Sequence, residues 1–187
     1  RAGYEVLTTY PEQCKMPGRT FTNTQQIEET LETVATSTET VRKNSSPKNS
    51  SYTLDGNVVS LVDGESISTT TPSSSSLETA KYYGNELRID LNEDGTSDSA
   101  FLLTYTTSGT GFFYYLVVAL NKKDTYTGTN GILLGDRIEP LSTEFKNGEI
   151  VVTYFDRLPT EPMVKKPSHK VSRHFKVMND TLVEILE

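Results

Sequence analysis

The chain of 187 residues contains a single cysteine, Cys14, and no tryptophan. One cysteine cannot form a disulfide within the chain, and a metal cluster built on several cysteines is excluded for the same reason. Long hydrophobic runs are also missing, since the longest, Phe112 to Leu120, is far shorter than the roughly 20 residues of a membrane helix. A chain of this length can fold without a disulfide or metal staple. The composition therefore predicts a soluble globular domain with polar appendages.

Positive charge is scarce as well. The chain has 18 Lys and Arg residues against 25 Asp and Glu residues, which gives a net charge of -7. Proteins bind the phosphate backbone of nucleic acids by neutralising it with Lys and Arg, and an acidic chain opposes this. We therefore expect no nucleic-acid partner.

The N-terminal third predicts a small module followed by a linker. Residues 23–34 begin with the potential cap residues Asn and Thr, and apolar residues recur on one helical face at Ile27, Leu31 and Val34. Beyond them the chain is rich in Ser, Thr, Lys and Asn, which is typical of a linker. The predicted organisation is a Cys and helix module at 1–36, a linker at 37–51 and a β domain at 52–187.

The β domain is predicted from its turns. Short apolar or alternating runs are separated by dipeptides that accept positive φ, namely Asp55-Gly56, Asp63-Gly64, Asn147-Gly148 and Asn179-Asp180. The run Phe112 to Leu120 lacks polar alternation, so we expect a central strand covered on both faces. The expected fold is mainly β: an antiparallel sheet domain, either a sandwich or a partly open barrel built of hairpins, with one short N-terminal helix.

Two polar insertions interrupt this pattern. Residues 66–76 include four consecutive serines and are expected to form a mobile surface loop. Residues 159–167 contain three prolines, which lack backbone donors, so an extended crossing segment is expected there instead of an interior strand.

One motif carries chemistry, the loop from Asp90 to Asp98. Oxygen-bearing side chains occupy loop positions 1, 3, 5 and 9, which are Asp90, Asn92, Asp94 and Asp98. Position 6 is Gly95, and position 7, Thr96, offers its backbone carbonyl. Calcium prefers six to eight oxygen ligands, which alternate side chains of a tight loop can supply. The motif resembles the DxNxDGxxD calcium loops of extracellular proteins. It departs from an EF-hand because position 12 is Phe101, so Asp98 would substitute for the missing Glu.

A plain turn is the alternative, because Asp, Asn and Gly all favour turns. Three aspartates in so short a loop would however repel one another without a cation. If calcium binds, we expect it to stabilise the fold and not to catalyse a reaction, since the loop brings no nucleophile with it.

The only basic cluster of this acidic sequence lies between Lys165 and Lys176. It includes both histidines, His169 and His174, which lie on opposite faces if this segment is a strand and then cannot chelate one metal. The cluster is either a solvated surface or a docking site for an acidic protein or an anionic polymer.

Enzymatic function is a rival interpretation. No Gly-x-Ser-x-Gly nucleophile elbow is present. A cleft that brings His169 or His174 near an Asp and a Ser would favour a hydrolase, and a rigid exposed loop would favour a protease inhibitor. The pairs Asp136-Arg137 and Asp156-Arg157 are expected to form cross-strand ion pairs or turn caps at strand ends.

Several segments of the chain resemble one protein family. These are residues 81–103, Gly109 to Tyr115, Tyr126 to Asn130, Leu134 to Ile138 and Tyr154 to Arg157. They are similar to an uncharacterised family of anchored bacterial envelope proteins that come largely from candidate-phylum bacteria. The resemblance implies an extracytoplasmic protein, held to a membrane as a lipoprotein or by another anchor through a segment absent from this chain. It implies no activity.

The segment that contains Cys14 has a separate resemblance. Gly3 to Cys14, followed by Pro17 to Thr22, is similar to a short YPxQC module of envelope proteins in which a second cysteine lies upstream. The resemblance implies that Cys14 pairs with a cysteine outside this chain, and a free thiol is the alternative. Because the chain begins with Arg1, we expect that any leader or anchor has been removed.

Overall fold

The computed structural model describes residues 45–69, 77–107, 109–123, 125–162 and 164–186. The chain divides into two units, Arg1–Ser37 and Thr38–Glu187, and all described residues belong to the second. The predicted helix at 23–34 and Cys14 lie outside the described residues.

The described residues form twelve β-strands and one 3-10 turn. Their bounds are η1 (Pro47–Asn49), β1 (Ser51–Leu54), β2 (Asn57–Ser60), β3 (Glu65–Thr69), β4 (Leu77–Ile89), β5 (Asp98–Thr106), β6 (Phe113–Asn121), β7 (Tyr126–Gly128), β8 (Ile132–Asp136), β9 (Glu139–Lys146), β10 (Glu149–Asp156), β11 (His169–Met178) and β12 (Thr181–Ile185).

The strands form three antiparallel sheets. A six-stranded sheet has the order β3-β4-β5-β6-β7, with β8 also paired to β6; a four-stranded sheet has the order β12-β11-β10-β9; and β1 pairs with β2. A parallel bridge between Thr53 and Asn130 connects the β1–β2 hairpin to the segment between β7 and β8. The prediction of a mainly antiparallel β domain is thus confirmed, and the described strands form no closed barrel.

The hairpin turns follow the sequence prediction. At each one, both central residues have positive φ: Asp55 (48°) and Gly56 (83°), Asn147 (54°) and Gly148 (82°), Asn179 (51°) and Asp180 (59°). Two successive positive φ values define the type I′ turn, whose twist matches that of the flanking strands. Asn, Asp and Gly tolerate this conformation better than other residues, which is why the hairpins fold where they do.

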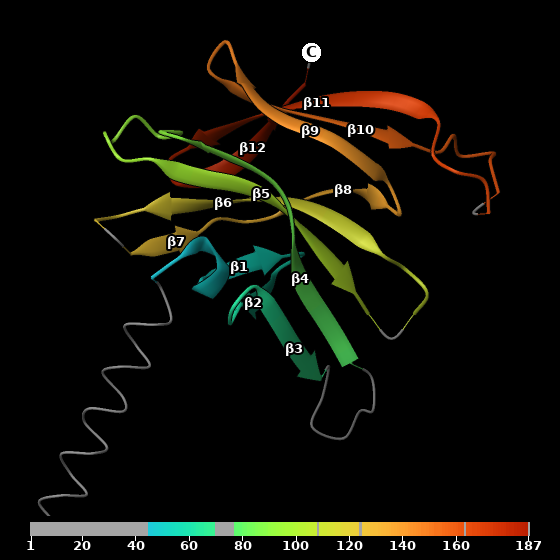
Figure 1. Ribbon diagram of the computed structural model, residues 1–187, viewed down its shortest axis with the longest axis horizontal. Helices are drawn as coiled ribbons and strands as arrows, with labels where there is room; N and C mark the ends of the chain where they lie inside the picture. Colours follow the sequence, from blue (N-terminus) through green and yellow to red (C-terminus); the bar gives the residue numbers. More distant parts are fainter. Residues whose placement is uncertain (1–44, 70–76, 108, 124, 163, 187) are drawn as a thin grey trace, which may run out of the picture. The chain divides into compact units, whose positions relative to one another are not determined.

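The central strands of the six-stranded sheet, β5 and β6, are buried on both faces. Figure 1 shows β9 to β12 on one side of β5 and β6, and β1 and β2 on the other. Residues from Tyr114 to Leu120 in β6 are all buried, and successive side chains enter opposite cores. One core lies against the four-stranded sheet and includes Phe175; the other lies against the hairpin and includes Tyr52. The predicted central strand is therefore confirmed.

Two segments differ from the sequence expectation. The end of the expected linker is packed, because Pro47 is buried, Ser50 is 1% exposed, and the Tyr52 hydroxyl donates to the Pro47 carbonyl at 2.6 Å. Residues 66–69 of the expected mobile loop belong to β3, which pairs with β4. In both cases a segment of polar composition is held in place by contacts with other parts of the chain, Tyr52 in the first and β4 in the second. Residues 70–76 lie outside the described part of the chain.

An ion pair stabilises the four-stranded sheet. Arg173 on β11 donates to both carboxylate oxygens of Glu184 on β12, at 2.6 and 2.7 Å, and Nη1 donates to the Leu133 carbonyl at 2.7 Å. The two side chains of the pair are only 21% and 28% exposed, whereas those of the Lys81–Glu65 pair are 53% and 54% exposed.

We expect Arg173→Ala to lower the free energy of unfolding by about 2 kcal/mol, because it leaves a half-buried carboxylate and a carbonyl without their donor. Lys81→Ala should cost less than about 1 kcal/mol, since exposed ion pairs contribute little. Urea denaturation of the two variants measures the difference. Equal losses would contradict the role given to burial.

Candidate functional site

The Asp90–Asp98 loop joins two long strands of the six-stranded sheet. It begins after Ile89, the last residue of β4, and ends at Asp98, the first residue of β5; these two residues are paired across the strands. Residues Glu93 and Gly95 have positive φ, 63° and 87°, which curls the backbone back on itself. The loop is therefore closed at its base and tightly turned at its tip.

The side chains at loop positions 1 and 3 converge on the same backbone amide. The Asp94 N–H is shared by Asp90 Oδ1 and Asn92 Oδ1, each 3.2 Å from the nitrogen. Asp90 Oδ2 also accepts the Gly95 N–H at 2.9 Å. Residues Asp90 and Asn92 thus place side-chain oxygens on the inner side of the curled loop.

Position 5 of the loop, Asp94, is held by its neighbours. Asp94 Oδ1 accepts the Thr96 N–H at 2.8 Å and lies 2.5 Å from the Thr96 hydroxyl, and Asn92 donates to Oδ2 at 3.0 Å. Hydrogen bonds from Thr96 and then from Asn92 hold the pKa of this carboxyl below its usual range. The Thr96 hydroxyl also lies 2.7 Å from the Asn121 carbonyl, which connects the loop to the end of β6.

Position 9, Asp98, is buried and has a different environment. The residue is 1% exposed, and its two carboxylate oxygens accept the backbone N–H groups of Leu91 at 2.9 Å and Asn121 at 2.8 Å. Burial raises the pKa of Asp98, and the negative charges of Asp94 and Asp90 raise it further. Asp98 therefore anchors the loop to β6 as well as closing its base.

These contacts bear on the ability of the loop to hold a cation. Asp90, Asn92 and Asp94 are brought together around shared backbone amides, whereas both oxygens of Asp98 already accept a backbone N–H. Across the described residues, no group of three or more His, Cys, Asp or Glu side chains is arranged to hold a metal ion. A carboxylate oxygen has more than one acceptor site, so an N–H contact does not by itself prevent coordination.

The basic cluster is divided by the pleat of β11. Arg173 is paired with Glu184 on the side of the sheet that faces the core, and Lys165 is paired with Glu161. His174 lies on the outer face, where Nδ1 is 2.8 Å from Oε2 of Glu149. His169 and His174 belong to one strand and are five positions apart, so they lie on opposite faces, as the sequence predicts.

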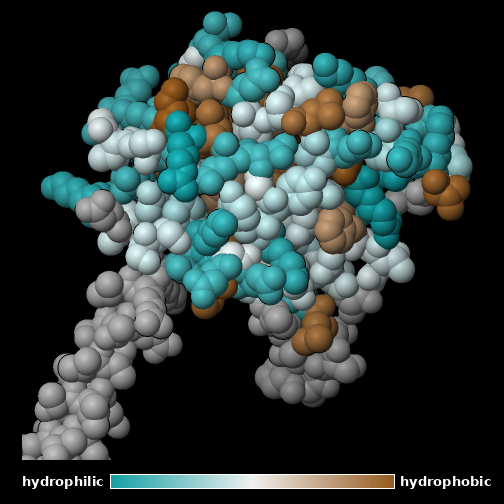
Figure 2. All heavy atoms as spheres, viewed as in Figure 1, coloured by the Kyte–Doolittle hydropathy of each residue, from teal (hydrophilic) through white to brown (hydrophobic). Residues whose placement is uncertain are grey.

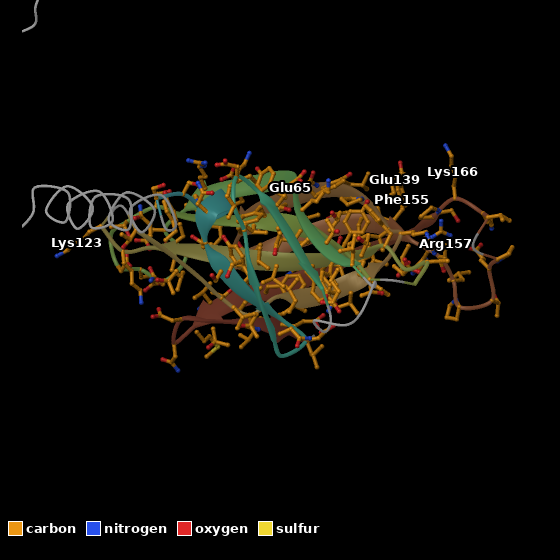
Figure 3. The ribbon with its side chains drawn as sticks, turned by 90° about the horizontal axis from the view of Figure 1, so that it is seen from below. Glu65, Lys123, Glu139, Phe155, Arg157 and Lys166 are labelled. Carbon is orange, nitrogen blue, oxygen red and sulfur yellow. The ribbon has the colours of Figure 1, made fainter. Side chains whose placement is uncertain are left out.

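A groove of about 460 Å³ lies on the outer face of β9, β10 and β11. Its lining includes Val151, Thr153, Lys170 and His174. Beyond the groove, Phe155 on β10 pairs with Glu139 on β9 and with Lys170 on β11; Figure 3 labels Glu139 and Phe155. The sequence did not predict this groove, since its lining comes from three strands that only the pairing register brings together.

A hydrolase is expected to bring a histidine near both a serine and an aspartate, and the groove does this only in part. It places Ser172 and His174 on the same face of β11, and the acidic partner of His174 is Glu149 and not an aspartate. The Ser172 hydroxyl lies 3.1 Å from the Thr153 hydroxyl, with which it is hydrogen-bonded. Nucleophilic catalysis requires the nucleophile to be hydrogen-bonded to its base, and Ser172 is bonded elsewhere.

The two Asp-Arg pairs have structural roles. Asp136 accepts the Phe112 N–H at 2.8 Å and is ion-paired with Arg137 at 3.1 Å. Arg157 donates to the Lys165 carbonyl at 2.6 Å and to the Arg137 carbonyl at 3.0 Å. The second pair therefore ties the proline-containing segment after β10 to the corner between β8 and β9. Both pairs lie at strand ends as expected, but the ion pair joins the chain neighbours Asp136 and Arg137 and is not cross-strand.

Two tyrosine–carboxylate contacts lie on the hairpin side of the six-stranded sheet. The Tyr115 hydroxyl donates to Asp55 at 2.5 Å, and the Tyr105 hydroxyl donates to Glu78 at 2.7 Å. Burial, and then the hydrogen bond to Glu78, raises the pKa of Tyr105 to about 12. Both hydroxyls remain protonated at neutral pH and act as donors, so these contacts are structural.

Exposed hydrophobic side chains do not define a further site. Figure 2 shows a mostly hydrophilic face with hydrophobic residues in several separate places. The most exposed large ones, Val164 at 94% and Leu186 at 84%, are in different segments. Single exposed hydrophobic residues are common on protein surfaces and need no functional explanation. Within the described residues, the structure has no helix with the length and apolar character required to cross a membrane.

Comparison of the sequence with models of protein families finds no match, and comparisons with curated proteins and with solved structures find none either.

Proposed function

We propose that this chain is an extracytoplasmic β module with a non-catalytic binding or structural role at a bacterial cell envelope, stabilised by Ca²⁺ at the Asp90–Asp98 loop. The observation that carries the calcium proposal is the convergence of Asp90 and Asn92 on the Asp94 amide. The envelope location rests on the resemblance of residues 81–103 and later segments to anchored envelope proteins.

The residues that would hold the ion are Asp90, Asn92, Asp94, Asp98 and the carbonyl of Thr96. All of them offer oxygen, which is the ligand atom that Ca²⁺ requires. A bound cation would offset the repulsion between the loop carboxylates, and it would do so at a position connected to β4, β5 and β6. Calcium would therefore stabilise the central sheet, and it supplies no group-transfer chemistry in this proposal.

The position of His174 supports a non-catalytic role. Its acidic partner is Glu149, and it lies among other polar side chains on the surface of the groove. The neighbouring Ser172 is hydrogen-bonded to Thr153. The basic cluster gives less support to an anionic partner, because Arg173 and Lys165 are already paired with acidic side chains.

Thermal unfolding of the metal-stripped chain, with and without millimolar calcium, tests the calcium proposal. An ion that binds only the folded state adds about 2.7 kcal/mol when its concentration is about a hundred times the dissociation constant. This corresponds to a rise in Tm of about 5 to 10 °C for a domain of this size. We expect the rise in the unaltered chain and its loss in Asp94→Ala.

A matched variant, Glu93→Gln, removes a carboxylate from the same loop at a position outside the ligand pattern, and it should keep the calcium response. An equal loss of the calcium-induced rise in Tm in both variants would show that calcium acts through the total negative charge of the loop and not through specific ligands. An unchanged Tm in the parent chain would reduce the loop to an acidic turn.

A further inference from the structure

The groove on the outer face of β9, β10 and β11 is lined largely by side chains. The backbone beneath its centre is used in the β9–β10 and β10–β11 ladders, whose registers are continuous through Val151; the β9–β10 register shifts only at the end of the groove, beside Leu141. A ligand in the groove would therefore be recognised by side chains. The volume of about 460 Å³ is within the range of small-molecule sites, roughly 300–1,000 Å³.

The charges in the groove are balanced. Glu144 is ion-paired with Lys146, and Glu149 Oε2 lies 2.8 Å from His174 Nδ1. The pKa of Glu144 is lowered chiefly by its hydrogen bond to Lys146, and the positive charge of Lys170 also contributes. Two carboxylates thus face two ammonium groups and one imidazole. A lining of this kind has no strong field of one sign, so it attracts neither a polyanion nor a polycation.

The centre of the groove combines hydroxyl groups with one apolar surface. Thr153 on β10 lies opposite both Ser142 and Ser172, and the Thr153 and Ser172 hydroxyls are 3.1 Å apart. Val151 lies one pleat away on the same face, between Glu144 and His174, and is 7% exposed. The floor therefore offers hydroxyls at one position and a small apolar surface at the next.

We propose that this groove binds a short neutral oligosaccharide. Acceptors on β9, such as Glu144, and donors on β11, such as Lys170, lie on either side of β10, which carries the Thr153 hydroxyl between them. Different hydroxyls of one ligand can donate to the first and accept from the second, so a row of hydroxyls satisfies both groups. The C–H face of a sugar ring would lie against Val151. This inference goes beyond the proposed calcium site, which is on a different sheet.

An NMR titration of the ¹⁵N-labelled full chain tests the inference. The neutral probes are cellotriose, maltotriose, mannotriose and triacetylchitotriose, and the anionic probes are heparin and polyglutamate. We expect at least one neutral trisaccharide to give saturable shifts confined to amides of β9, β10 and β11. Thr153→Arg, which fills the groove, and Glu144→Gln, which removes an acceptor but keeps the shape, should each weaken binding by about tenfold or more.

The matched control is Lys176→Gln, which alters the outward face of the same β11 strand beyond the groove and should leave the affinity unchanged. Thermal unfolding of each variant separates a lost site from a lost fold, and Glu144→Gln retains the test if Thr153→Arg does not fold. Shifts at the groove with the anionic probes alone would overturn the inference in favour of an anionic partner. The absence of groove shifts with all four neutral probes would also overturn it. The titration is run without calcium. A negative result for the oligosaccharide inference is therefore independent of whether the Asp90–Asp98 loop binds calcium.

Discussion

Gly128→Ala is expected to lower the free energy of unfolding by about 3 kcal/mol, because overpacking against a fixed backbone cannot be relieved by a side-chain rotation. A Cβ at Gly128 in β7 would lie 2.2 Å from the Ser51 carbonyl oxygen and 2.5 Å from the Tyr52 ring. Relief requires β1 to move away from β7. That movement would expose Tyr52, which is 1% exposed, and open the core beneath the hairpin.

Urea denaturation measures the loss, and hydrogen exchange locates it. Amides of β1 and β2 should lose protection before those of β9 to β12, since the hairpin contributes to one core and the four-stranded sheet to the other. Gly109→Ala is the control: its Cβ would approach no atom closer than 3.7 Å, and a change within about 0.5 kcal/mol is expected. Equal stability of the two variants would show that the hairpin moves without cost.

Local conformational requirements explain what the sequence predicts well. The turns at Asp55-Gly56, Asn147-Gly148 and Asn179-Asp180 each need two positive φ values, a requirement that few residue types meet. Burial of both faces of β6 is likewise visible in the uninterrupted run of apolar residues. These features are determined within a few residues, so they can be inferred without knowing the partner strands.

Strand β4 shows where such inference ends. Its residues Gly84 and Asn85 have φ of 120° and 51°, which is typical of a turn, yet they lie within a strand that pairs with β5 on both sides of them. The register shifts around Gly84 absorb the irregular residues as bulges. Only the partner strand distinguishes a bulge from a turn, and this information is not local.

The same limit applies to the sites. The spacing of the Asp90–Asp98 loop predicts a calcium site, but the anchoring of Asp98 on the Asn121 amide depends on how β5 pairs with β6. The groove depends even more on register, because Glu149 and His174 meet only through the pairing of β10 with β11. The polar residues that alternate along β11 indicate that one face of the strand is polar, but the sequence does not identify the residues of β10 that lie beside them.

Asp98→Asn is expected to destabilise the calcium-free protein by about 2 to 3 kcal/mol. An asparagine side chain has one oxygen, whereas the Asp98 carboxylate accepts N–H groups from both Leu91 and Asn121. The substitution leaves one buried N–H without an acceptor and places an amide NH₂ near it, and an unsatisfied buried donor costs about 1 to 3 kcal/mol. Urea denaturation in the presence of EDTA measures the loss without any contribution from a bound ion.

Comparison with Asp94→Ala separates anchoring from ion binding. Asp94 is exposed and its hydrogen bonds lie within the loop, so its loss should cost much less stability in EDTA than the loss of Asp98, while abolishing the calcium response. Asp98→Asn should instead show a large loss in EDTA, because the side chain no longer ties the loop to β6 through both oxygens, and it should also weaken the calcium response. If Asp98→Asn were neutral in EDTA and only removed the calcium response, the two backbone contacts would be dispensable. Asp98 would then serve as a ligand alone, and the order of the β4–β5–β6 end of the sheet would depend on the ion.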